Sequence, residues 1–264
     1  MAMASTDVLI VQLLGQYLAP AALALARLLA CFAWLPYLSS GVLPSRVVRV
    51  ALALVVMIGL WPVTEGLQQP AGPFALALSI ASEALVGTAI GLMLALPYHV
   101  FHAVGSLVDV QRGAGVGAMM SPLSGVEATE MANLLQLMSA VVFLVAGGLV
   151  PLMQVVHESY RLVPLGGRFV PEPGALHSFV DVMLWAALRM AAPVLLLLFL
   201  VEIVLGVISR FAQQLNAFSV SLSVKSLITF VALLVYLMLA LTGQVPSLWT
   251  DHPALHVLTA SGAQ

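Results

Sequence analysis

The chain has 264 residues, of which 62% are hydrophobic and only 8% are charged. Soluble domains carry about 25% charged residues. This chain has too few polar side chains to cover the surface of a soluble fold of its size. Nine basic and eleven acidic residues give no strongly basic surface for nucleic acid. The single cysteine, Cys31, excludes an internal disulfide and a cysteine-based metal site.

Six apolar stretches predict an all-α, polytopic membrane protein. They lie at about Val8–Leu35, Val42–Trp61, Phe74–Pro97, Met131–Val156, Val180–Ser209 and Leu222–Thr242. A spanning helix needs about 20 apolar residues, and no stretch alternates with the period of a barrel strand. We expect the first stretch to remain uncleaved, because no basic region precedes it.

Several of these stretches are too short or too charged for lipid. In the second, only residues 50–61 are free of charge, which is about 18 Å of helix against a hydrocarbon core of about 30 Å. Arg27, Glu83, Arg189 and Glu202 interrupt others, and a charge at mid-helix costs about 2.5–3.5 kcal/mol. Two hypotheses stay open for Glu83 and Glu202: a place along a passage, or a salt bridge between helices, for instance with Arg27 or Arg189.

The connection at about 161–178 is rich in proline and glycine, and it predicts the best internal boundary. We therefore expect an N-terminal region over residues 1–170 and a C-terminal region over residues 171–264.

The stretch VDVQRGAGVGAMMSPLSG, at 108–125, is glycine-rich and apolar. Its Gly113, Gly115 and Ala118 fit a loose dinucleotide-binding pattern, but that pattern requires a preceding strand, and a membrane helix is expected here. Irregular backbone is tolerated at membrane depth only where protein buries it or water lines it. Met119 and Met120 have adaptable side chains that can close a changing gap. A moving seal and an ordinary connecting loop remain equal alternatives on composition.

No catalytic constellation is present, so we expect no enzyme and no cofactor. The pairs His99/His102 and His252/His256 each supply at most half a metal site. These observations favour a transporter, a channel component or a scaffold.

Four stretches together resemble one family, the T component of type III secretion export machines (the SctT family, with YscT, SpaR and HrcT), which is homologous to flagellar FliR. They are RLLACFAWLPYLSSGVLPSRVVR at 27–49, DVQRGAGVGAMMSPLSG at 109–125, ESYRLVP at 158–164 and GVISRFAQQLNAFSVSLSVKS at 206–226. The resemblance covers roughly 23–243, and its QRG and ESY pieces are more similar to the injectisome branch. Gln213 stands where the family usually has proline, and Ser121 where it often has aspartate.

The resemblance implies a structural and gating subunit of the export gate in the bacterial inner membrane. Partners would be the small membrane components R and S (P and Q in flagella) and the larger export-gate subunits, in a helical gate partly at periplasmic level through which unfolded secreted proteins pass. Residues 1–170 would be R-like, with a plug loop at about 108–125, and residues 171–264 would be an S-like hairpin with a polar tail. The plug residues would be Gln111, Arg112, Gly113, Gly115, Gly117, Met119, Met120 and Pro122. Candidate subunit contacts are Arg210, Gln214, Asn216 and Lys225. A stand-alone small-solute transporter and a passive membrane scaffold are the alternatives.

Overall fold

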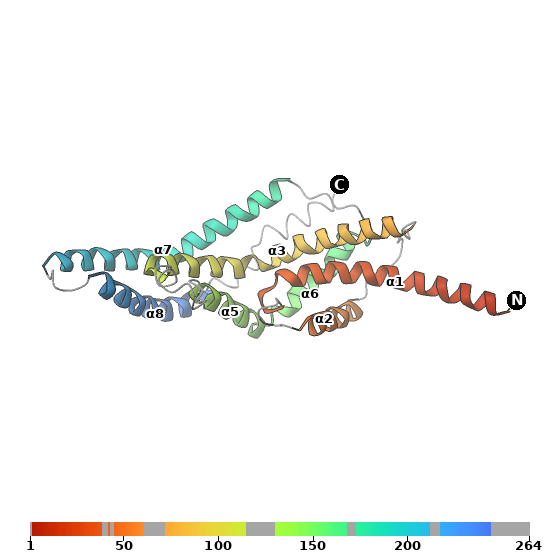
Figure 1. Ribbon diagram of the computed structural model, residues 1–264, viewed down its shortest axis with the longest axis horizontal. Helices are drawn as coiled ribbons and strands as arrows, with labels where there is room; N and C mark the ends of the chain where they lie inside the picture. The colour runs from red at the N-terminus through yellow and green to blue at the C-terminus, as the bar shows by residue number, and fades with distance from the viewer. Residues whose placement is uncertain are drawn as a thin grey trace. The chain divides into compact units, whose positions relative to one another are not determined.

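All regular structure in the described residues of the chain is helical, as the apolar stretches predict. The computed structural model describes residues 2–38, 42, 45–60, 72–114, 130–167, 173–211 and 217–243. The elements are α1 (Ala2–Trp34), the short 3-10 helix η1 (Pro36–Leu38), α2 (Arg46–Gly59), α3 (Pro73–Arg112), α5 (Glu130–Val145), α6 (Leu149–Leu162), α7 (Pro173–Phe211) and α8 (Ala217–Gly243) (Figure 1).

Helix α3 continues through Pro97 to Arg112, so the prediction that it ends near Pro97 is wrong. The flexible stretch therefore does not begin at Val108. Proline is tolerated inside membrane helices because neighbouring groups satisfy the freed backbone carbonyl. The helix ends where Gly113 adopts a positive φ of 87°, which glycine reaches without a steric penalty.

The apolar stretch predicted at 131–156 is two helices rather than one. Helices α5 and α6 are separated by three residues in a turn and bend by 86°. Gly147 at this turn has a φ of 79°, a left-handed conformation that ends a helix. The pair forms one broken span or a re-entrant element.

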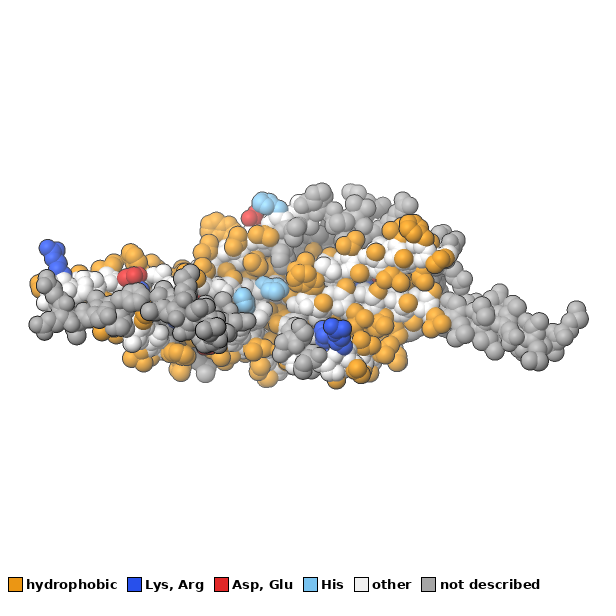
Figure 2. All heavy atoms as spheres, in the orientation of Figure 1, with side chains coloured by type: hydrophobic (Ala, Val, Ile, Leu, Met, Phe, Trp, Pro, Cys, Tyr) orange, Lys and Arg blue, Asp and Glu red, His pale blue; other side chains and the backbone are white. Residues whose placement is uncertain are grey.

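Two described helices are long and apolar enough to cross a membrane: Pro73–Arg112 and Val180–Phe211. The bent α5–α6 pair raises the number to three if it forms one span. Helix α2 has 14 residues, about 21 Å of helix, which confirms that the second stretch is too short to span. Hydrophobic side chains are spread over the described surface in view, and charged groups are sparse (Figure 2).

The described helices form two compact units that interleave along the sequence. The first contains α1, η1, α2, α3 up to Ala95, and α6. The second contains α3 from Leu96, together with α5, α7 and α8. The division at 170/171 into R-like and S-like regions stays a prediction.

Each unit has its own apolar core. In the first, Leu23, Leu28 and Phe32 of α1 and Val86 and Ile90 of α3 are buried. The core of the second joins one face of α3 to the other three helices, through Leu96, Val100, Phe101, Val104, Val108, Met131, Leu135, Ala187, Met190, Ala191, Val194, Leu198 and Leu233.

Candidate functional site

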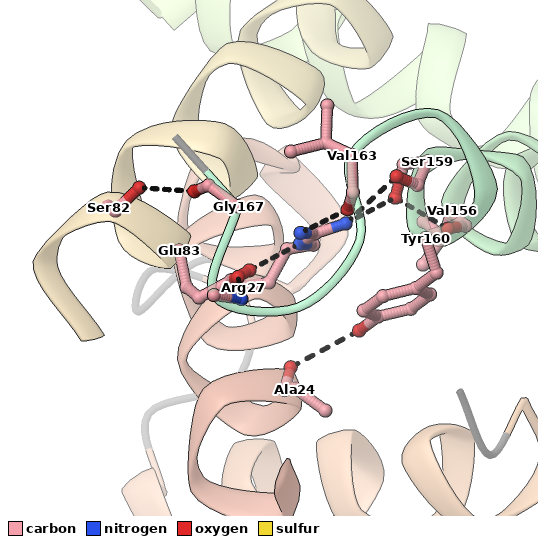
Figure 3. A network of polar contacts seen from close by, with 10 residues as sticks. Ala24, Arg27, Ser82, Glu83, Val156, Ser159, Tyr160, Val163 and Gly167 are labelled. Carbon is pink, nitrogen blue, oxygen red and sulfur yellow. Dashed lines mark hydrogen bonds and ion pairs between the residues drawn. The ribbon is translucent and has the colours of Figure 1, made fainter. Parts of the chain in front are cut away.

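A buried arginine organises the first unit. Arg27 of α1 is 1% exposed, and its Nε donates to Oε2 of Glu83 on α3 at 2.7 Å. Its Nη1 donates to the carbonyl oxygen of Ser159 at 3.0 Å, and its Nη2 donates to the carbonyl oxygen of Val163 at 2.8 Å (Figure 3). The guanidinium carbon also lies 4.5 Å from the ring centroid of Tyr160. All three guanidinium nitrogens therefore have acceptors, which a buried cation requires.

The surrounding groups extend this network to the turn after α6. The second carboxylate oxygen of Glu83 accepts the backbone N–H of Gly166 at 2.8 Å. Ser82 donates to the carbonyl of Gly167 at 3.2 Å, and the Tyr160 hydroxyl donates to the carbonyl of Ala24 at 3.3 Å. The cation at the end of α6 also offsets the partial negative charge of the final helix carbonyls. The network thus joins α1, α3 and the C-terminus of α6.

Two glycines on α3 permit the close approach of α1 that this network needs. A Cβ on Gly91 would lie 2.6 Å from the carbonyl oxygen of Cys31, and one on Gly87 would collide with the carbonyl oxygen of Arg27. Small residues let membrane helices pack backbone to backbone. Of the two hypotheses for Glu83, the structure therefore shows the salt bridge with Arg27. Arg189, the other candidate partner, is in the second unit and is exposed.

A second polar group lies at the end of α3, in the second unit. The side chain of Asp109 is 2% exposed, and its Oδ2 accepts the backbone N–H groups of Met131 and Ala132 at 3.1 and 3.3 Å. Its Oδ1 lies 2.8 Å from Nε and 2.7 Å from Nη2 of Arg112. A carboxylate at the N-terminus of a helix satisfies free N–H groups and complements the helix dipole. Asp109 thus caps α5 from another helix, a role that the sequence analysis missed.

Gln111 contacts a third group, which joins α3, α7 and α8. Its Nε2 lies 3.5 Å from Oε2 of Glu202, whose Oε1 lies 3.1 Å from Nζ of Lys225. The Lys225 side chain is 9% exposed, whereas that of Glu202 is 54% exposed. A Cβ on Gly113 would lie 2.8 Å from Cδ2 of Leu222 on α8. The predicted plug residues Gln111 and Gly113 therefore lie beside α7 and α8, and Arg112 lies beside Asp109.

The remaining candidate residues divide into two classes. Arg210, near the end of α7, is exposed. Outside the described residues lie Gly115, Gly117, Met119, Met120, Pro122, Gln214 and Asn216. Among the residues that the structure describes, no three His, Cys, Asp or Glu side chains are grouped so that they could hold a metal ion.

Comparison with known proteins gives a consistent set of relatives. Residues 18–249 match the family described as bacterial export proteins, family 1. The chain is 40% identical over 218 residues to the surface presentation of antigens protein SpaR of Salmonella typhimurium, covering 83% of this chain and 82% of that protein. It is 30% identical over 227 residues to the Yop proteins translocation protein T of Yersinia pestis, covering 82% and 85%. The flagellar biosynthetic protein FliR of Escherichia coli is 24% identical over 196 residues, covering 74% and 75%.

Proposed function

The chain belongs to family 1 of the bacterial export proteins, and on this premise we propose that it is a structural and gating subunit of the export gate of a type III secretion system. It helps form and close the passage for unfolded substrate proteins. The name of the Yersinia relative refers to protein translocation, which favours protein export over small-solute transport. The higher identity to the SpaR and Yop relatives than to FliR supports the injectisome branch.

The observation that carries the gating proposal is the geometry where α3 ends and α5 begins. Asp109 hydrogen-bonds the first turn of α5, so the end of α3 and the start of α5 lie next to each other. A link between these two helix ends supports a gate in which they stay together while the passage opens and closes. The residues that we propose for the plug are Gln111 and Arg112, at the end of α3, and, after the helix, Gly113, Gly115, Gly117, Met119, Met120 and Pro122. Glycine reaches both halves of backbone space at low cost, and methionine side chains adapt to whatever gap remains.

The surface of α7 supports assembly with other membrane subunits. Large hydrophobic side chains are exposed along its second half, among them Leu196, Phe199, Leu200, Ile203, Val207 and Phe211. A helix that is hydrophobic on most of its surface requires lipid or other apolar protein around it. We propose the small components R and S and the larger export-gate subunits as partners, in the bacterial inner membrane and partly at periplasmic level. Arg210, Gln214, Asn216 and Lys225 are the proposed contact residues.

Deletion of Gly113–Met120 tests the gating proposal. We expect the shortened chain and the intact chain alike to copurify with small polytopic membrane proteins in a large complex. We expect cells that contain it to leak small ions, measured as the rate of potassium loss. A deletion of the same length over 63–70, in another segment between helices, serves as the control and leaves the leak unchanged. An assembled complex with the Gly113–Met120 deletion and no added leak would remove the plug from the proposal.

A further inference from the structure

The end of α3 and the start of α5 are joined by one carboxylate. Asp109 is 22 positions away from Met131 in the sequence, yet its Oδ2 accepts the N–H groups of Met131 and Ala132. These groups belong to the first turn of α5, where backbone N–H groups have no partner within the helix.

The packing one turn earlier fixes the same pair of helices. A Cβ on Gly105 of α3 would collide with the backbone of Ala132, and its contacts include the backbone of Met131. Helix α3 therefore contacts the start of α5 at two levels, through the missing side chain of Gly105 and through the carboxylate of Asp109. Two contacts along one helix restrict both the separation and the tilt of the other.

Arg112 compensates the buried charge of Asp109. It belongs to the same helix, three residues later, and its side chain is 14% exposed. A buried carboxylate is tolerated when a cation and hydrogen bonds together offset the cost of removing it from water. With its four contacts, Asp109 is an internal link between two helices rather than a group presented to the surroundings.

We propose that Asp109 is a positioning residue of the export gate, which holds the end of α3 against the start of α5 while the gate works. This inference rests on the proposed function, because α3 and α5 flank the segment assigned to the plug. It assigns Asp109 no contact with a transported protein. Its effect on export is exerted through the geometry of the two helix ends.

A distance measurement tests the link independently of export. Spin labels are attached to cysteines at Val110 and Leu134, which are 78% and 46% exposed, in the Cys31→Ala background and in the assembled membrane complex. Asp109→Ala is expected to lengthen and broaden the distance distribution between the labels. We expect the population of separated conformers to rise about tenfold, since the loss of a side-chain cap costs about 1.4 kcal/mol. Glu130→Gln is the matched control, because it removes an exposed carboxylate in the same first turn of α5.

The milder variant keeps the test decisive if Asp109→Ala fails to assemble. Asp109→Asn retains one acceptor oxygen for α5 and loses the ion pair with Arg112, so a smaller broadening is expected. Distances identical to those of the intact protein in whichever variant assembles would overturn the proposal.

The rate of potassium loss separates this inference from the proposed function. If deletion of Gly113–Met120 causes a leak and Asp109→Ala causes one as well, with Glu130→Gln silent, the positioning role is supported. If the deletion causes a leak but the Asp109 variant does not, despite altered distances, Asp109 is only structural and the inference fails. If the deletion itself causes no leak, the gating function fails, while the distance measurement still decides whether Asp109 links the two helices.

Discussion

Replacement of Arg27 by methionine tests how much the buried network stabilises the fold. Arg27→Met removes the ion pair with Glu83 and the hydrogen bonds to Ser159 and Val163. It leaves the Glu83 carboxylate, 1% exposed, with the N–H of Gly166 as its remaining hydrogen bond. Breaking a buried pair in this way costs about 3–5 kcal/mol.

Glu83→Gln is expected to cost less than Arg27→Met. The guanidinium keeps the carbonyls of Ser159 and Val163 and the ring of Tyr160. The carboxamide has one oxygen where the carboxylate accepts from both Arg27 and Gly166. One donor is therefore left without an acceptor, at about 1–3 kcal/mol.

The assay is the free energy of unfolding of the purified chain in mild detergent, from a denaturant titration. Glu158→Gln is the control in the same region of the fold, because Glu158 pairs with Arg161 at 3.6 Å with both side chains more than half exposed. Its effect should stay within about 0.5 kcal/mol. The double variant Arg27→Met/Glu83→Leu should lower the free energy of unfolding by less than the sum of Arg27→Met and Glu83→Leu measured singly, because the two charges act as a unit. A Glu83→Gln effect larger than that of Arg27→Met, or additive single effects, would refute this reasoning.

Two further pairs of variants test helix packing and the third polar group, with the same unfolding assay. Gly105→Ala should lower the free energy of unfolding by about 1–3 kcal/mol, because its Cβ collides with Ala132. Gly206→Ala has open space around it and should raise the free energy of unfolding by about 0.5–1 kcal/mol. Equal effects of the two variants would contradict the close crossing of α3 and α5. Glu202→Ala should lower the free energy of unfolding by about 1–3 kcal/mol, because it leaves the buried ammonium of Lys225 without its carboxylate. Lys225→Met should lower it by less than about 1 kcal/mol, because Glu202 is half exposed. The reverse order of the two effects would show that Lys225 has another anion.

The apolar stretches locate the helices well, but not their ends. An end of α3 at Pro97 is expected from the sequence because proline usually interrupts a helix. The residues that follow favour a continued helix, since Tyr98, Phe101, Val104 and Val108 recur at helical spacing and are all buried. The helical periodicity of these apolar residues outweighs the effect of the proline, because side chains are packed both before and after Pro97 and hold the helix together.

The break between α5 and α6 is readable in the sequence but weaker than the hydropathy around it. Gly147 and Gly148 stand side by side within an uninterrupted apolar run. Length and hydropathy alone predict one spanning helix there. The positive φ of Gly147 shows that the local backbone preference of glycine decides the outcome.

Sequence reasoning reaches the polar groups but only some of their partners. A charge in an apolar helix has to be paired, so the alternative of an Arg27–Glu83 salt bridge follows from the sequence. The carbonyls of Ser159 and Val163 and the N–H groups of Met131 and Ala132 are backbone groups that almost every residue type presents. Their use depends on which helix ends the tertiary fold brings close, and no local spacing encodes it.

The intramembrane charges are of two kinds, which differ in how completely their hydrogen bonds are satisfied within the chain and in how exposed their side chains are. Arg27 and Glu83 are each 1% exposed, and both groups form their hydrogen bonds with one another and with the backbone, so neither is available to a protein in transit. Glu202 also has partners, Gln111 and Lys225, but its side chain is half exposed in the apolar stretch of α7 between Arg189 and Arg210. A charged group that contacts a passage or a neighbouring subunit must be exposed on the isolated chain. It must also be unfavourable to leave that group exposed to lipid. Glu202 meets both conditions, whereas the Arg27 network holds α1, α3 and α6 together.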